Sequence, residues 1–204
     1  MNPIAMPVWD PQLRRASAVA TGLWLFMAVA STLFALFITA YAMRMIASDW
    51  SPIAMPPQLW LSTALLLTGS LLLHGAARAA HSRRLVAGRR LLMAGGLAAM
   101  AFLGCQLWAW QHLLDARVEL AGNPAASFFY VLTALHGLHV IGGLVAWSVT
   151  AQAAAPPSTD PSRLALHVRL CARYWHFLLA LWCVLFATLA WLTPERVRYI
   201  CGLD

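Results

Sequence analysis

The stretch Ser127-Phe-Phe-Tyr-Val-Leu-Thr-Ala-Leu-His-Gly-Leu-His-Val-Ile-Gly-Gly-Leu-Val-Ala-Trp147 decides the fold of this chain. It contains no Asp, Glu, Lys or Arg, and it is long enough to cross a bilayer as one helix, which takes about 20 residues. In its middle stand His136 and His139, which share one helix face because they are three residues apart. Burying two imidazoles in an apolar helix costs free energy unless each finds a partner. Nearby Thr133 and Gln106, or backbone carbonyl groups, are the candidates to bond them.

The composition of the whole chain has the same apolar character. Of its 204 residues, 61% are hydrophobic and 10% are charged, whereas a soluble domain carries about 25% charged residues. The sequence therefore predicts an all-α, polytopic membrane protein that forms a single membrane domain over residues 1–204. All 14 basic residues are Arg. They stand between apolar blocks, which favours a role as topology signals over nucleic-acid binding.

Five apolar blocks are predicted to span the membrane, at about residues 19–43, 59–80, 91–113, 127–151 and 172–193. Residues 1–18 are expected to form a tail and residues 152–171 a loop. The third span opens with small residues, Gly95-Gly96 among them, that would let another helix approach closely. Because the connections are short, consecutive helices should pack as neighbours. A signal peptide is the alternative for the first block, although its apolar core would have only about 7–15 residues.

The arginines are distributed unevenly between the two sides that five spans would create. One side would hold Arg14, Arg15, Arg78, Arg83, Arg84, Arg89, Arg90, Arg163, Arg169 and Arg173. The other side would hold Arg44, Arg117, Arg196 and Arg198. Basic residues are enriched on the cytoplasmic side of membrane proteins. We therefore expect the N-terminus inside and the C-terminus outside.

The predicted spans contain no carboxylate, whereas proton pumps and ion-coupled transporters usually keep Asp or Glu within the membrane. The paired histidines could hold a metal ion or a haem. A third ligand is missing from their helix face, however, and His176 is predicted to lie at a different depth. We therefore expect no catalytic centre, cofactor or metal in this chain. The histidines should be hydrogen bonded between helices or to a neighbouring subunit, with His136 uncharged near neutral pH.

Three residues near the ends of spans are candidates for contact with lipid: Arg173, Trp175 and Trp24. The long side chain of Arg173 can reach the headgroup layer and hold a lipid phosphate. Tryptophans near span ends are typical membrane-interface anchors, and those in the middle of spans are expected to face lipid or a partner protein.

Four motifs resemble subunit III of the haem–copper oxidases in its short, five-helix form. Residues 128–143 resemble F-F-x-x-T-G-x-H-G-x-H-V-x-x-G, and Arg173-Tyr-Trp-His-Phe177 resembles the family's A-R-Y-W-H-F-V-D. Leu23-Trp-Leu-Phe26 resembles the start of the first helix. Gln106 with Trp110 resembles Q-x-x-E-W. The resemblance covers all five spans in order.

This resemblance implies a subunit of an aerobic respiratory chain that has no redox centre of its own. Subunit I would hold the haems and copper, and subunit II would join through the complex. The resemblance also implies bound phospholipid and support for stability, sustained turnover and proton uptake, in a bacterial inner membrane.

Three departures from the family pattern remove a carboxylate each. Ala30 stands at a family glutamate, Ala109 at the glutamate before the tryptophan, and Leu179 at the family aspartate. Because a half-satisfied buried polar network is worse than none, we interpret the three changes as coordinated removal of an acidic network. They favour, as an alternative, an accessory protein of another haem–copper enzyme such as nitric-oxide reductase. A stand-alone membrane haem protein and a small transporter are the remaining alternatives.

Overall fold

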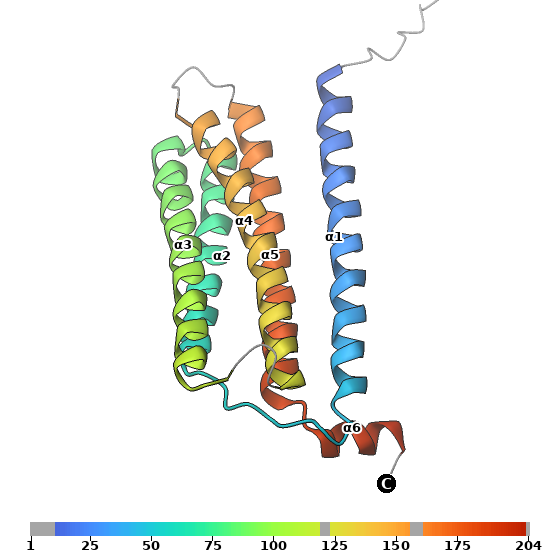
Figure 1. Cartoon of the computed structure of the whole chain (residues 1–204). Helices are drawn as coiled ribbons and strands as arrows, with labels where there is room; N and C mark the ends of the chain where they lie inside the picture. Colours follow the sequence, from blue (N-terminus) through green and yellow to red (C-terminus); the bar gives the residue numbers. More distant parts are fainter. Residues whose placement is uncertain (1–10, 119–122, 156–160, 203–204) are drawn as a thin grey trace, which may run out of the picture.

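The computed structural model describes residues 11–118, 123–155 and 161–202 as helices joined by connecting segments (Figure 1). These residues contain no strand. The helices are α1 (Pro11–Arg44), α2 (Gln58–His81), α3 (Leu85–Asp115), α4 (Pro124–Ala153), α5 (Pro161–Trp191) and α6 (Pro194–Cys201). Helices α1 to α5 are long and apolar enough to cross a membrane. This confirms the predicted all-α fold with five spanning helices.

The helices begin earlier than predicted at two places. A tail was predicted over residues 1–18. Residues 1–10 of it lie outside the described residues, and the prediction is wrong for residues 11–18, because α1 begins at Pro11. The loop expected over residues 152–171 is wrong from residue 161 onward, because α5 begins at Pro161. Proline suits the first turn of a helix, and Leu164 in the next turn is buried. The polar residues of this segment therefore belong to the outer faces of a helix.

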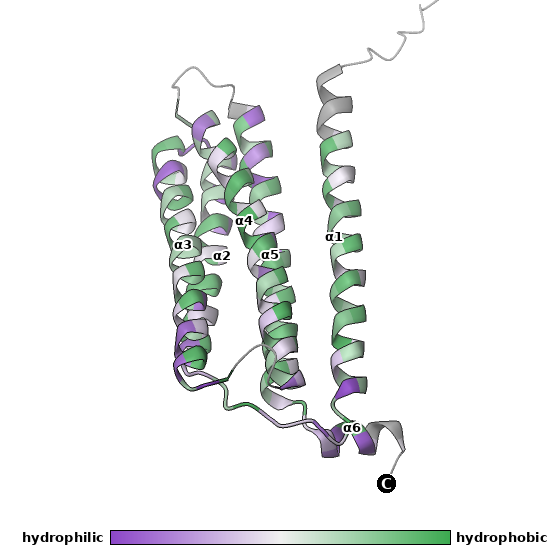
Figure 2. Cartoon of the chain, viewed as in Figure 1, coloured by the Kyte–Doolittle hydropathy of each residue, from purple (hydrophilic) through white to green (hydrophobic). Residues whose placement is uncertain are grey.

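A short amphipathic helix, α6, follows the fifth spanning helix. Thr193 caps its N-terminus by accepting a hydrogen bond from the backbone N–H of Arg196, with Pro194 in the first turn. Gly202 ends it with a φ of 66°, a left-handed conformation that glycine adopts without a steric penalty. Figure 1 shows α6 at the end of the bundle where α1 ends, and Figure 2 shows that the hydrophilic residues gather at the ends of the spanning helices.

Helices α2 and α3 approach each other closely through small residues. An added methyl group at Gly95 would come within 2.7 Å of Leu73, and one at Gly69 within 3.3 Å of the Gly95 carbonyl oxygen. Without a hydrophobic driving force between helices in lipid, such close packing supplies much of the attraction. The predicted role of the small residues in the third span is confirmed for Gly95.

Helix α1 packs chiefly on α5 and α4, so the expectation that consecutive helices are packed neighbours is wrong for α1 and α2. The connection over residues 45–57 passes along the end of the bundle and lets α1 lie beyond α5 (Figure 1). Phe34 of α1 is fully buried in this contact region, while Leu25 and Leu36 remain exposed.

An ion pair closes the turn that follows α1. The Arg44 guanidinium donates two hydrogen bonds to the Asp49 carboxylate, one of them 2.6 Å long. These bonds lower the pKa of the Asp49 carboxyl. Both side chains are exposed to solvent, so the pair defines the local geometry of the turn more than it stabilises the fold.

Candidate functional site

His136 lies at the centre of the bundle, on α4, and is fully buried. Its ring contacts Phe102 of α3 at 5.7 Å between centroids and Trp182 of α5 at 5.1 Å. Within the described structure neither ring nitrogen has a hydrogen-bond partner. The imidazole therefore fills space among aromatic rings, and its polar atoms are left unsatisfied.

His139 lies one helical turn further along α4 and faces α1. Its Nδ1 is 2.7 Å from the Leu135 carbonyl oxygen, so this nitrogen is the donor. Phe26 and Phe34 of α1 flank the ring, with centroids at 5.8 and 5.4 Å. The Tyr174 hydroxyl of α5 donates to the His139 carbonyl oxygen at 3.1 Å. His139 thus joins α1, α4 and α5.

The two residues predicted to bond these histidines have other partners. The Thr133 hydroxyl donates to the Phe129 carbonyl oxygen at 2.6 Å and accepts from the Trp110 indole N–H at 3.1 Å. The Gln106 side chain donates to the Ser62 hydroxyl at 3.1 Å. The expectation that Thr133 and Gln106 satisfy the histidines is therefore wrong, and the alternative of a backbone carbonyl partner is confirmed for His139.

The three positions at which the family pattern has a carboxylate and this chain does not lie in or beside the packed interior. Ala30 and Ala109 are buried, and Leu179 is partly buried against the core. Ala30 is four residues from both Phe26 and Phe34, so it shares their helix face and faces the His139 ring that they flank. The apolar alanine side chain at this position supplies no carboxylate to the His139 ring.

His176 lies on α5 and is paired with α2. Its Nδ1 is hydrogen bonded to the Ser70 hydroxyl, and its Nε2 is 3.3 Å from Nδ1 of His74. The His136 ring instead contacts Phe102 and Trp182, so the structure does not bring His176 and His136 together. Across the described residues, no three His, Cys, Asp or Glu side chains lie close enough to hold a metal ion.

The three predicted lipid contacts have different surroundings. Trp24 of α1 is 58% exposed, and the Arg173 guanidinium lies 5.5 Å from the centre of its ring, within the range of a cation–π contact. Trp175 is fully buried, so the prediction that it contacts lipid is wrong. It occupies the α5 face turned inward, where it lies near Gly143 of α4.

The indole of Trp182 connects four helices. It donates a hydrogen bond of 2.9 Å to the Thr63 hydroxyl of α2 and contacts Phe102 of α3 and His136 of α4. The residue is fully buried. The expectation that tryptophans in the middle of spans face lipid or a partner is therefore wrong for Trp182.

The sequence of the chain matches a known protein family. A family profile described as cytochrome c oxidase subunit III matches residues 14–193. The chain belongs to the cytochrome c oxidase subunit III family. The match extends from the first turns of α1 to the end of α5 and confirms the resemblance seen in the motifs.

Individual members of this family match the chain over most of its length. A protein of Nocardia farcinica named probable cytochrome c oxidase subunit 3 is 28% identical over 184 residues, which cover 87% of this chain and 89% of the relative. Cytochrome c oxidase subunit 3 of Synechocystis is 29% identical over 170 residues, covering 81% and 72%. The protein of that name from Thermostichus vulcanus is 27% identical over 176 residues, covering 84% and 86%.

Sequence reasoning missed the contacts that join helices far apart in the chain. The bond from Trp182 to Thr63 and the pairing of His74 with His176 both connect α2 with α5. The available signal was the polar residue type at membrane depth, since such groups seek partners there. The sequence did not say which helices face each other.

We expect His136→Leu to raise the stability of the purified chain. A buried polar group without a partner costs about 1–3 kcal/mol, and leucine would fill the same space between Phe102 and Trp182 without that cost. The midpoint of thermal unfolding in detergent would measure the change. His139→Leu is the matched control. The His139 ring is hydrogen bonded to the Leu135 carbonyl oxygen, so its removal should lower the midpoint. A lower midpoint for His136→Leu would mean that the ring nitrogens are satisfied.

Proposed function

We propose that this chain is the non-catalytic subunit III of a bacterial haem–copper terminal oxidase and packs on subunit I in the inner membrane. The family match over residues 14–193 is the observation that carries the proposal. Relatives from Nocardia farcinica and Synechocystis bear the oxidase subunit's name and are matched over most of their own length. In this role subunit I holds the haem and copper, and subunit II joins through the complex.

The proposed orientation has the N-terminus in the cytoplasm. Ten of the 14 arginines lie in the halves of the helices, or in the connections between them, on the side where α1 begins, and this imbalance supports the orientation. Basic residues of short loops favour the cytoplasmic side. The C-terminal helix α6 would then lie on the outer side.

The proposed lipid contact lies between α1 and α5. Trp24 exposes most of its indole, and the Arg173 guanidinium above it can donate hydrogen bonds to a phosphate oxygen. Helix α1 contacts the bundle chiefly through α5 and α4, so an acyl chain lying along α1 would add to its packing. This contact would support the stability of the complex.

Membership in another haem–copper enzyme, such as a nitric-oxide reductase, is the second candidate. The observation that favours it is the apolar character of Ala30, Ala109 and Leu179, two of which are fully packed. The proton-related part of the subunit III role depends on ionisable groups, and these positions do not supply them.

The role in sustained turnover is tested by comparing the oxidase with and without this chain. Oxidase isolated from cells that lack the chain should keep its haem spectrum and its initial rate of oxygen consumption, because the redox centres lie in another subunit. Its activity should then decay several-fold faster during continuous turnover, and adding the chain back should restore the time course. Identical decay in the two preparations would contradict this role.

A further inference from the structure

A cluster of buried polar side chains joins the start of α2 to α3. The Gln106 side chain donates to the Ser62 hydroxyl at 3.1 Å, and the neighbouring Cys105 thiol donates to the Gln58 carbonyl oxygen at 3.3 Å. Gln58 is 7% exposed, Gln106 6% and Ser62 0%. The two glutamines therefore lie in the same part of the contact between the two helices, closed off from the surface.

The amide oxygens of both glutamines lack a donor. Each Oε1 atom is fully buried and receives no hydrogen bond from any group that the structure describes. Donors nearby are engaged elsewhere, because the Ser62 hydroxyl donates to the Leu59 carbonyl oxygen at 2.9 Å and the Trp110 indole N–H donates to α4. A buried oxygen without a donor carries the full cost of leaving water, and native structures rarely leave such groups unpaired.

One water molecule can supply what the two oxygens lack. It carries two hydrogen atoms, so it can donate to both amide oxygens at once, and buried waters typically satisfy groups of this kind. The surrounding side chains are small. Ser62 and Ala109 are fully buried, and Ala109 places only a methyl group on the helix face that it shares with Gln106, three residues earlier.

A cation fits this place less well than water. A hard cation such as calcium takes six to eight oxygen ligands and prefers carboxylates. The cluster offers two side-chain oxygens without a donor, and residues 58–113 contain no Asp or Glu. The neutral amide oxygens therefore suit a neutral donor of hydrogen bonds.

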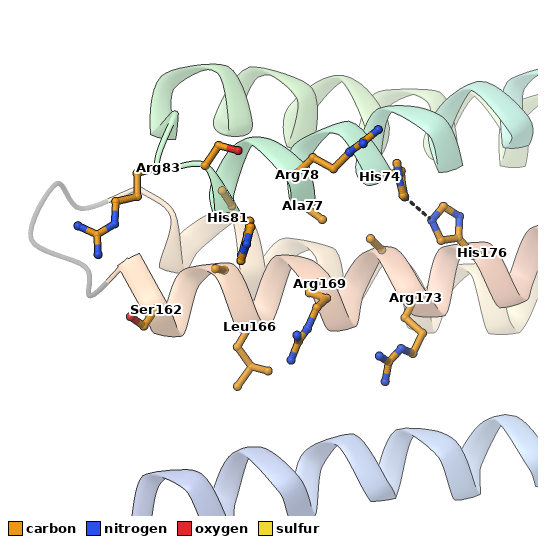
Figure 3. A pocket seen from close by; sticks show the side chains of 14 residues that line it. His74, Ala77, Arg78, His81, Arg83, Ser162, Leu166, Arg169, Arg173 and His176 are labelled. Carbon is orange, nitrogen blue, oxygen red and sulfur yellow. Dashed lines mark hydrogen bonds between the residues drawn. The ribbon is translucent and has the colours of Figure 1, made fainter.

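The polar groups at the other end of α2 can be hydrated from outside. A cavity of about 790 Å³ lies there between α2 and α5 (Figure 3), and Arg78 and Arg169, which line it, are exposed. The imidazoles of His74 and His176 bond each other at its edge. The glutamine oxygens have no such opening beside them, so a water molecule held there would exchange slowly with its surroundings.

We propose that α2 and α3 hold an ordered internal water molecule that donates hydrogen bonds to the Oε1 atoms of Gln58 and Gln106. The water completes the polar cluster and fixes the start of α2 against α3. Interhelical hydrogen bonds help to hold helices together in lipid, where the hydrophobic effect does not drive them together. The proposal goes beyond the proposed function and does not require it, because the water is detected in the full chain without an oxidase.

Radiolytic footprinting of the purified full-length chain in a non-ionic detergent tests for this water. An X-ray pulse splits bound and bulk water into hydroxyl radicals, which oxidise the side chains that they touch, and mass spectrometry locates the products. Transfer into heavy-oxygen water for increasing times before the pulse shows how fast the water at each side chain exchanges. Cys105 reports on the internal water, and Tyr199 of α6, which is 79% exposed, reports on bulk water.

The test variant is Gln58→Leu with Gln106→Leu, which removes both acceptors and keeps apolar side chains of similar size. Gln58→Leu alone replaces it if circular dichroism shows that the double variant has lost its helices. The matched control is Gln111→Leu, because Gln111 is an exposed residue of the same helix α3. Each protein is measured in sodium chloride and in choline chloride.

Cys105 of the wild type should be oxidised, and its heavy-oxygen content should rise several-fold more slowly than that of Tyr199. Labelling of Cys105 should fall several-fold in the test variant, remain unchanged in Gln111→Leu, and be equal in the two salts. A Cys105 that stays unlabelled in the wild type would overturn the proposal and would indicate a direct bond between the glutamines. Exchange as fast as at Tyr199, undiminished labelling in the test variant, or labelling that depends on sodium would overturn it as well.

Discussion

Trp182→Ala should destabilise the chain by about 3–5 kcal/mol, the usual cost of removing a buried aromatic side chain. The indole is fully buried and contacts rings of α3 and α4, while its N–H donates to Thr63 of α2 at 2.9 Å. Alanine would leave a cavity at the point where four helices meet. Unfolding of the purified chain in a mixed detergent and denaturant series, followed by circular dichroism, would measure the loss.

Two milder variants separate packing from hydrogen bonding at this residue. Trp182→Phe keeps a ring and removes the donor, and Thr63→Val leaves the indole N–H unpaired, so each should cost about 1–3 kcal/mol. Trp108→Ala is the control, because Trp108 is 53% exposed and its removal leaves no cavity. Equal losses for Trp182→Ala and Trp108→Ala would show that Trp182 does not hold the bundle together.

Gly96→Ala should destabilise the chain by about 2–4 kcal/mol through overpacking and a lost hydrogen bond. An added methyl group at Gly96 would lie 2.1 Å from the Trp147 indole. That indole donates a hydrogen bond of 2.8 Å to the Leu92 carbonyl oxygen. The ring would have to swing away, and the contact between α3 and α4 would lose its bond and its packing together.

Gly104 on the same helix provides the matched control for this substitution. A methyl group there would meet nothing within 4 Å, and alanine is a better helix former than glycine by about 1 kcal/mol. Gly104→Ala should therefore leave the unfolding midpoint unchanged or raise it. If Gly96→Ala unfolds like the wild type, the Trp147 indole does not occupy the groove above Gly96.

The sequence predicts the spanning helices well because their apolar length depends only on local composition. It predicts the start of α5 poorly, because Arg163 and Arg169 resemble loop residues and only the buried Leu164 and Val168 between them indicate a helix. The signals for α6, a capping Thr193 before a proline, were present in the sequence but belong to a helix too short to stand out.

The sequence predicts which polar residues lie inside the site, but it does not predict their hydrogen-bond partners. The histidines, Gln106 and Thr133 were identified as the polar groups at membrane depth, yet Gln106 bonds Ser62 of another helix. Such pairings depend on the rotation of each helix and on which helices are neighbours. Chain order does not determine the neighbours, because α1 packs chiefly on α5 and α4. The contact of α1 with the His139 ring, which gives Ala30 its surroundings, is a tertiary feature that the sequence does not contain.

Purification of the intact complex through an affinity tag on this chain tests the central claim most directly. We expect the tag to recover a larger catalytic subunit with the optical spectrum of haem and with bound copper, and the preparation should reduce oxygen. Recovery of the chain alone with a haem absorbance of its own, or together with an enzyme that reduces nitric oxide and not oxygen, would contradict the account.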